Sequence, residues 1–155
     1  YELSLGLVGS EMCIRDSHTG ITVHNLDLMV NFYTQNLGLR VLREIEMEAP
    51  SSGDHTGIPG AHRKLVFLGL DDTHEIELVH YVSPPASEGH LDRHQLGSMH
   101  VGFLVDDLRE LHSRLSAQGG HFATEPKFKE EDGATVGVIY ARDPEGNWLE
   151  FIERN

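Results

Sequence analysis

The sequence predicts an α+β fold made of two βαβββ modules, whose mixed sheets curve into a cupped, barrel-like shape. A nine-residue pattern carries this prediction, because HTGITVHNL at His18–Leu26 returns without a gap as HVGFLVDDL at His100–Leu108. A glycine follows each copy at the same offset, Gly38 after the first and Gly120 after the second. Strand-like runs and turn signals then follow in the same order. Such self-similarity indicates a duplicated supersecondary unit.

The first module is expected to span residues 18–82 and to begin with a strand over His18–Val23. Asn25 is suited to cap the next helix, and Gly38 is suited to end it. The apolar stripe of that helix consists of Leu26, Met29, Val30, Tyr33 and Leu37. The strands that follow are expected at Arg40–Met47, Lys64–Leu70 and Glu75–Tyr81. The polar turn Asp71–His74 joins the last two.

The second module, residues 98–155, repeats this order. Its elements are expected to be a strand at Met99–Val105, a helix at Asp107–Gln118, and strands at His121–Thr124, Thr135–Ala141 and Trp148–Glu153. The sequence Asp143–Asn147, DPEGN, is a strong turn signal before the final strand. The linker between the modules is residues 83–97, which are rich in Pro, Ser and Gly. The long loop Ala49–Ala61 is either a lid or a mobile connection.

Composition limits the classes of partner. The formal net charge of −13 disfavours binding to a nucleic acid backbone. No apolar run reaches the length that crosses a bilayer, and the first residues lack the basic flank of a secretory signal. A single cysteine, Cys13, excludes a framework of intramolecular disulfides. We therefore expect a cytoplasmic protein that acts on a small molecule, without nucleic acid or membrane partners.

The opening residues 1–17 do not resemble part of a fold. The stretch LVGSEMCIRDS back-translates to a nucleotide sequence that resembles a transposase-based sequencing adapter. We therefore expect residues 1–17 to be a non-native extension on a gene of metagenomic origin. On this interpretation His18 is the first native residue in the sequence.

Strand alternation selects four side chains for the face that the helices leave open. His18 and His100 begin the first strands of their modules and point away from the apolar residues that follow at alternate positions. Glu77 lies between Ile and Leu, and Glu150 lies between Leu and Phe, in the last strand of each module. If the apolar neighbours face the helices, both carboxylates face the open side. The four side chains are then expected to converge.

Two glutamates inside a curved sheet are costly to bury unless a cation lies between them. Two imidazoles and two carboxylates suit Ni²⁺, Co²⁺, Zn²⁺, Mn²⁺ or Fe²⁺ with positions left for substrate. Taken singly, a strand glutamate usually faces solvent and a strand histidine is usually not a ligand. The repetition of both residues at matching places favours the metal interpretation.

Four motifs resemble the vicinal oxygen chelate superfamily, which includes glyoxalase I, extradiol dioxygenases and bleomycin resistance proteins. They are HTGITVHNLDLMVNFYTQNLGLRVL, HEIELVHY, GSMHVGFLVDDL and DPEGNWLEFIE, and together they extend from His18 to Glu153. The resemblance implies paired βαβββ modules around one divalent metal ion. It places the four metal ligands at His18, Glu77, His100 and Glu150. In several members two chains share each site, so a homodimer is expected.

Within that superfamily the His/Glu/His/Glu set is similar to that of bacterial glyoxalase I. This implies a lactoylglutathione lyase-like enzyme that chelates the vicinal oxygens of a 2-oxoaldehyde hemithioacetal and moves a proton through an enediolate. By the resemblance Glu150 is the catalytic base, with Glu77 on the opposite side of the substrate. The chain has Thr22 and Tyr81 where those enzymes tend to carry an arginine and an asparagine, so glutathione as co-substrate stays an open question.

Three alternatives remain. The first is an epimerase or isomerase with the same proton chemistry on a substrate without glutathione. The second is an extradiol dioxygenase, which needs only three of the four ligands. The third is a metal-free binding protein of the resistance type. The remaining histidines are predicted not to bind metal, with His80 expected to lie nearest the substrate. They are His24, His55, His74, His80, His90, His94, His112 and His121. The run His62–Lys64 is either an anion-binding group or solvated surface.

Overall fold

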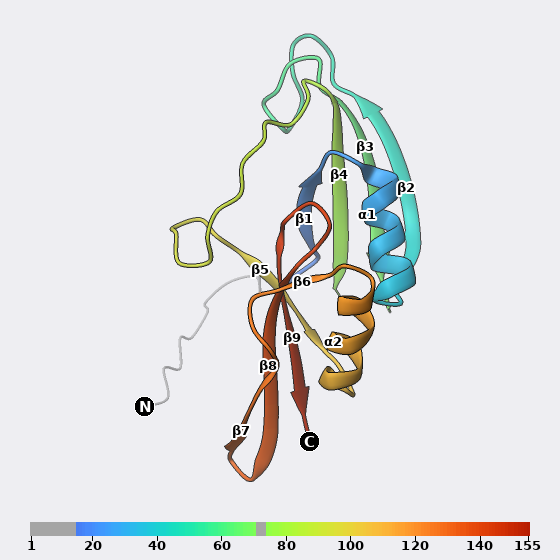
Figure 1. Ribbon diagram of the computed structural model, residues 1–155. Coiled ribbons are helices and arrows are strands. Elements are labelled where there is room, and N and C mark those ends of the chain that lie inside the picture. The colour runs from blue at the N-terminus through green and yellow to red at the C-terminus, as the bar shows by residue number, and fades with distance from the viewer. Residues whose placement is uncertain (1–14, 71–73) are drawn as a thin grey trace, which may run out of the picture.

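The computed structural model describes residues 15–70 and 74–155. Residues 1–14 of the predicted extension and Asp71–Thr73 of the predicted turn lie outside that part of the chain. The described residues form two open sheets with their helices on one side (Figure 1). None of the described helices combines the length and the apolar character needed to cross a bilayer.

The first sheet has the strand order β1-β4-β3-β2. Its strands are β1 (His18–Val23), β2 (Arg40–Glu48), β3 (His62–Gly69) and β4 (Glu75–Ser83). β1 pairs with β4 in parallel, and the other neighbours are antiparallel. The first strand therefore lies at the edge of the sheet beside the last one, which brings His18 next to the strand that carries Glu77.

The second sheet repeats this arrangement with the order β5-β9-β8-β6 and with β7 added on β8. Its strands are β5 (His100–Leu104), β6 (His121–Phe122), β7 (Lys127–Glu131), β8 (Ala134–Arg142) and β9 (Trp148–Arg154). β5 and β9 are again parallel, like β1 and β4. The shared strand order confirms the duplication that the repeated nonapeptide predicts.

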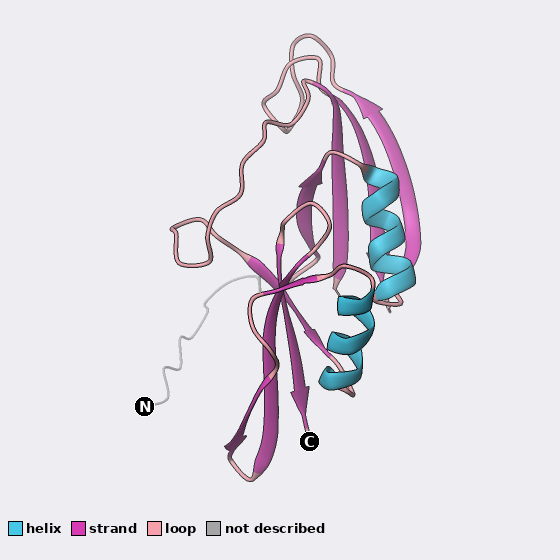
Figure 2. Cartoon of the chain, in the orientation of Figure 1, coloured by secondary structure: helices cyan, strands magenta, loops and turns pink. Residues whose placement is uncertain are grey.

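The helices cover one face of each sheet (Figure 2). Helix α1 (Leu26–Asn31) continues directly as the π-helical segment η1 (Phe32–Asn36), and helix α2 (Leu108–Ala117) serves the second sheet. A single cluster of buried side chains joins both helices and both sheets. From the helical segments it includes Met29, Phe32, Tyr33, Leu108, Leu111 and Leu115. The two modules therefore share one hydrophobic core, whose burial stabilises both.

The predicted strand faces are confirmed. In β4, Ile76 and Leu78 are 4% and 0% exposed, so the glutamate between them points away from the core. In β9, Leu149 and Phe151 are 0% and 1% exposed and leave the glutamate between them on the open side in the same way. The predicted helix cap is also present, since the Asn25 side chain accepts a hydrogen bond of 3.0 Å from the backbone N–H of Leu28.

Two strands differ from the prediction. Strand β7 was not expected, because its sequence KFKEE has one apolar residue and reads as a solvated loop. It forms because it pairs along its whole length with β8, through a tight turn in which Asp132 and Gly133 have φ of 51° and 78°. The predicted strand His121–Thr124 shortens to the two residues of β6. The sheets stay open, without a closed barrel in the described residues.

The DPEGN turn of the second module binds the helix of the first. The buried carboxylate of Asp143 accepts a hydrogen bond of 3.0 Å from the Tyr33 hydroxyl. The Glu145 carboxylate accepts hydrogen bonds of 2.7 and 2.6 Å from the backbone N–H groups of His24 and Asn25, just before α1. These contacts fix the start of β9 relative to the first module, and so they position the strand that carries Glu150.

Tyr33→Phe is expected to remove an alkaline weakening of the fold. Burial raises the pKa of Tyr33 well above 10, and the charge of Asp143 raises it further. The folded protein therefore keeps the phenol proton at a pH where the unfolded chain has lost it, and stability falls as the pH rises above about 10. Between pH 9 and pH 11 the wild type should lose about 1.4 kcal/mol more free energy of unfolding than the variant.

Urea unfolding at the two pH values measures this difference. Tyr81→Phe, at a partly exposed tyrosine of β4, is the control and should follow the wild type. Equal alkaline losses in the wild type and in Tyr33→Phe would show that the buried phenol is not the source.

Candidate metal centre

Each sheet carries one histidine beside one glutamate on its open face. The Nε2 atom of His18 lies 3.4 Å from Oε2 of Glu77, and the Nε2 atom of His100 lies 3.2 Å from Oε2 of Glu150. The exposed fractions also match, at 41% and 43% for the histidine side chains and 18% and 19% for the glutamates. The duplicated sequence pattern therefore produces duplicated geometry.

A glycine makes room for each carboxylate. In the parallel pairing, Gly20 is the partner of Glu77 and Gly102 is the partner of Glu150. A Cβ atom at Gly20 would lie 3.3 Å from Oε2 of Glu77, and one at Gly102 would lie 3.9 Å from Oε2 of Glu150. The carboxylate in the first sheet is therefore the more closely fitted of the two. Both glycines are the third residue of their nonapeptide, so the repeat provides the space for a carboxylate in each sheet.

An aromatic ring supports each histidine edge-to-face. The ring centroids of His18 and Phe67 are 5.9 Å apart, and those of His100 and Tyr140 are 5.2 Å apart. Phe67 is the antiparallel neighbour of Glu77, and Tyr140 is that of Glu150. Each site half therefore consists of a histidine, a glutamate, a glycine and an aromatic ring on adjacent strands.

The two aromatic residues belong to the candidate site, and the sequence reasoning missed them. A signal was present, because Phe67 and Tyr140 each lie ten residues before the glutamate of their module. The rings also distinguish the halves, since only the second has a hydroxyl group. Partial burial raises the pKa of Tyr140, and the neighbouring charge of Glu150 raises it further.

A second glutamate on the same face of β4, Glu75, forms an ion pair with an arginine. The guanidinium of Arg43 donates hydrogen bonds of 2.7 and 2.6 Å to the two carboxylate oxygens of Glu75, and it lies 3.7 Å above the centre of the Phe67 ring. These hydrogen bonds lower the pKa of Glu75. Glu75 is thus held as the partner of Arg43, which leaves Glu77 as the carboxylate beside the histidine.

The four predicted ligands lie in the structure as two pairs. Within residues 15–70 and 74–155, no three His, Cys, Asp or Glu side chains of one chain group closely enough to hold a metal ion. One chain by itself therefore offers two half-sites, each with one imidazole nitrogen and one carboxylate. The described residues of one chain therefore do not bring all four side chains together.

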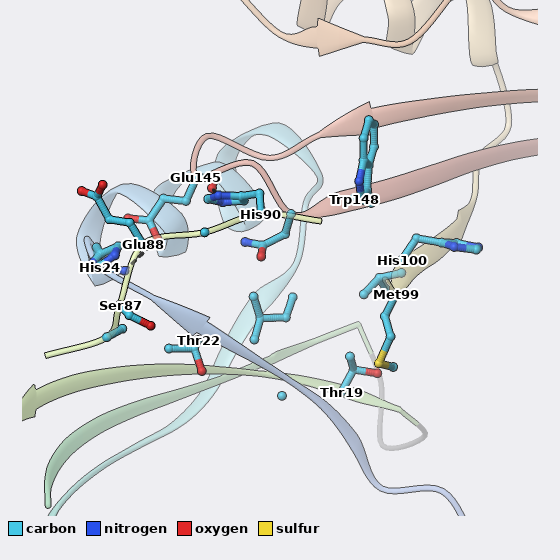
Figure 3. Close-up of a pocket in the computed structure, with 16 residues that line it drawn as sticks. Thr19, Thr22, His24, Ser87, Glu88, His90, Met99, His100, Glu145 and Trp148 are labelled. Carbon is cyan, nitrogen blue, oxygen red and sulfur yellow. Dashed lines mark hydrogen bonds between the residues drawn. The ribbon is translucent and has the colours of Figure 1, made fainter. Parts of the chain in front are cut away.

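A hollow of about 790 Å³ lies between strands β1 and β5 and includes His100 in its lining (Figure 3). Thr19 and Thr22 of β1 line one side, and Met99 and His100 line the other. β1 and β5 are each the edge strand of their sheet and do not pair with one another. Both edges consequently border the same open space.

Two of the other histidines, His24 and His90, also line the hollow, whereas His80 and the run His62–Lys64 do not. His80 alternates with Glu77 along β4, and its Nδ1 atom lies 3.2 Å from the Val23 carbonyl, so it is on the face opposite the half-site. Of the run His62–Lys64, Arg63 is buried and forms an ion pair with Asp54 of the long loop. The expectation that His80 meets the substrate stays a prediction, and the place of His80 on the opposite face does not favour it.

The donor set fits a divalent transition metal. Two imidazole nitrogens and two carboxylates match the preferences of Zn²⁺, Ni²⁺, Co²⁺, Fe²⁺ and Mn²⁺. In the first half-site the hydroxyl of Ser17, the last residue of the predicted extension, lies 3.0 Å from Nδ1 of His18, which leaves Nε2 directed at Glu77. A hydrogen bond at the other ring nitrogen is the usual arrangement for a metal-binding histidine.

Comparison with known proteins agrees with the family resemblance seen in the sequence motifs. The family model of the Glyoxalase/Bleomycin resistance protein/Dioxygenase superfamily matches residues 16–151. The lactoylglutathione lyase of Haemophilus influenzae is 30% identical over 141 residues, which cover 88% of this chain and 90% of that protein. An uncharacterized protein of Bacillus subtilis, YwbC, is 28% identical over 92% of this chain and 100% of its own length.

Solved structures show the same fold. A glyoxalase family protein from Bacillus cereus has a TM-score of 0.82 at 23% identity, with 96% of this chain and 99% of that chain covered. The trypanothione-dependent glyoxalase I of Leishmania major has a TM-score of 0.65 at 23% identity, with 91% and 87% covered. With a family model that spans nearly all of the described residues, the chain belongs to the Glyoxalase/Bleomycin resistance protein/Dioxygenase superfamily.

Proposed function

We propose that the protein is a metal-dependent, glyoxalase I-like enzyme that moves a proton between adjacent carbons of a substrate with vicinal oxygens. The observation that carries the proposal is the duplicated histidine–glutamate pair on the open face of both sheets. Support comes from relatives named lactoylglutathione lyase that match most of the chain at 28–30% identity. The substrate class is a 2-oxoaldehyde hemithioacetal or another compound with vicinal oxygens.

We further propose that two copies of the chain complete each metal centre. One half-site supplies only two protein ligands, fewer than the three or more that protein metal sites generally use. A twofold axis would bring the edge strand β5 of one copy beside β1 of the other, and would do so twice. His18 and Glu77 of one subunit would then face His100 and Glu150 of its partner at each of two equivalent sites.

In the proposed reaction Glu150 takes the proton from the carbon next to the carbonyl and returns it to the adjacent carbon. The substrate is isomerised and no proton is lost overall. A bound divalent cation would supply Lewis-acid stabilisation of the oxygen charge that develops. Glu77 completes the donor set on the other side, and Phe67 and Tyr140 hold the two imidazoles in place. With side chains 18% and 19% exposed, the two carboxylates are largely withdrawn from bulk water.

Metal analysis of the purified protein, followed by an assay with methylglyoxal and glutathione, tests the proposal. We expect about one divalent ion per chain and a rise in melting temperature on adding Ni²⁺, Co²⁺ or Zn²⁺ to metal-depleted protein. Absence of both would contradict a metalloenzyme and favour a metal-free binding protein. Metal binding without glutathione-dependent turnover would redirect the search to other proton-transfer substrates.

Gly20→Ala is expected to weaken metal binding about tenfold, because the new methyl group meets Oε2 of Glu77 at 3.3 Å and displaces the carboxylate. Gly102→Ala is the matched control, since its methyl group would lie at an ordinary contact distance of 3.9 Å from Oε2 of Glu150. Titration of each metal-depleted variant with Zn²⁺ compares the affinities. Equal affinities would show that the fit of Gly20 against Glu77 has no role in metal binding.

A further inference from the structure

A short turn before β5 contacts the second sheet close to the half-site formed by His100 and Glu150. The indole N–H of Trp148 donates a hydrogen bond of 2.9 Å to the carbonyl of Leu91. Asp92 lies 3.9 Å from the guanidinium of Arg142, and its backbone N–H donates a hydrogen bond of 2.7 Å to the side chain of Gln95. The backbone N–H of Gln95 in turn donates a hydrogen bond of 3.0 Å to the Asp92 carbonyl. The turn Asp92–Gln95 is therefore attached to the second sheet through Leu91 and Asp92, and it is closed by its own hydrogen bonds.

Arg93 projects from this turn onto two aromatic rings. Its guanidinium carbon lies 5.0 Å from the ring centre of Tyr140 and 4.8 Å from that of Trp148. Stacking on two rings orients a guanidinium without using its N–H donors. In the part of the chain that the structure describes, no carboxylate or carbonyl pairs with Arg93, so these donors remain available.

The other arginines of these faces are already engaged. Arg142 also lies over Trp148, at 3.8 Å, but it donates a hydrogen bond of 2.8 Å to the Gly146 carbonyl. Arg43 is bound to Glu75. Arg63 is buried with Asp54, so the basic run that the sequence suggested for an anion is engaged in the fold itself. Arg93 is therefore the guanidinium available beside the second half-site.

Arg93 is close enough to meet a molecule bound at the metal centre. Tyr140 is shared by both groups, because its ring packs on His100 at 5.2 Å and supports Arg93 at 5.0 Å. The guanidinium consequently lies within about 10 Å of the His100 imidazole. Planar carboxylates are the natural partners of a pre-oriented guanidinium, which binds them with two parallel hydrogen bonds.

We propose that Arg93 binds a carboxylate group of the substrate whose vicinal oxygens occupy the metal centre. This inference rests on the proposed function and adds a charge requirement to it: the substrate, or the thiol joined to it, carries a carboxylate a few bonds from the chelating oxygens. Arg93 is thus a specificity-determining residue contributed by the linker.

Fluorescence of Trp148 gives a direct test, because it is the single tryptophan of the chain and Arg93 lies against it. The Zn²⁺-loaded protein is titrated with 2-oxoglutarate and with pyruvate, which share vicinal oxygens but differ in a distal carboxylate. A second arm compares glutathione with its diethyl ester, in which both carboxylates are esterified. In at least one arm, we expect the probe with the additional carboxylate, 2-oxoglutarate or glutathione, to bind about tenfold or more tightly than pyruvate or the ester, respectively. The arm that discriminates identifies whether an oxo acid or a thiol carries the carboxylate.

Arg93→Gln should remove the discrimination, and Arg93→Lys should restore part of it. Arg109→Gln is the matched control, since Arg109 stacks on Phe128 at 3.7 Å from helix α2 and should behave as the wild type. Equal binding of both members in both pairs, or discrimination that survives Arg93→Gln, would overturn the inference. The same titrations on metal-free protein separate the two proposals. If the carboxylate-bearing probe binds more tightly and Arg93→Gln removes this preference, the role of Arg93 is supported even where no metal binds. If the preference is absent both without metal and with Zn²⁺, the result counts against Arg93 and leaves the proposed metal-dependent function untouched.

Discussion

Glu150→Gln is expected to lower turnover of methylglyoxal with glutathione by about 10²- to 10⁴-fold. Glutamine has the same size as glutamate but cannot accept the proton at neutral pH. Because its amide oxygen still occupies the place of Oε2, the protein should fold normally and retain most of its metal. Steady-state kinetics and metal analysis of the same preparation separate the two effects.

Glu75→Gln is the matched control for this substitution. Glu75 lies on the open face of β4 as well, but it is bound to Arg43 and is not paired with a histidine. Its loss should change turnover less than threefold, because a single, partly exposed ion pair contributes little. A Glu150→Gln protein that turns over normally once saturated with metal would show that Glu150 is only a ligand and that the base lies elsewhere.

His18→Ala and His100→Ala are each expected to abolish metal-dependent activity. Each removes the imidazole nitrogen of one half-site, and in the proposed dimer that half-site recurs at both metal centres. Metal affinity should fall by at least about 100-fold, and stabilisation by added metal should be lost. Isothermal titration with Zn²⁺ and melting curves with and without metal measure both quantities.

His55→Ala is the control for these two variants. Its side chain is 75% exposed in the long loop between β2 and β3, away from either half-site, so affinity and activity should be unchanged. If either single variant, His18→Ala or His100→Ala, keeps the metal affinity of the wild type, that histidine is not a ligand.

Much of the fold could be predicted because the duplication repeats local signals. The alternation of apolar residues around Glu77 and Glu150 was sufficient to assign both to the open face, and the buried Ile76, Leu78, Leu149 and Phe151 confirm it. Strand β7 escaped prediction because its residues are mostly charged and its pairing with β8 depends on the turn at Asp132 and Gly133. Period-two patterns report burial on one face, and an exposed edge strand has little of it.

The sequence predicts which side chains face the open side of each sheet, but it does not predict how those side chains are arranged. Alternation tells which face a side chain occupies, and it does not tell how far one sheet lies from the other. In the described residues, His18 and Glu77 do not form one cluster with His100 and Glu150. Arg93 was invisible for a different reason, since a linker residue acquires its role only when the turn around it docks on Tyr140 and Trp148.

Mixing two inactive proteins tests the shared metal centre most directly. His18→Ala and His100→Ala are combined, subunits are allowed to exchange, and turnover with methylglyoxal and glutathione is measured. In a mixed dimer one centre takes both damaged half-sites, and the other takes both intact ones. With random exchange, activity should therefore return to about a quarter of the wild-type level. If each centre lay within a single chain, every centre would stay damaged, and a mixture as inactive as its two components would contradict the proposed shared site.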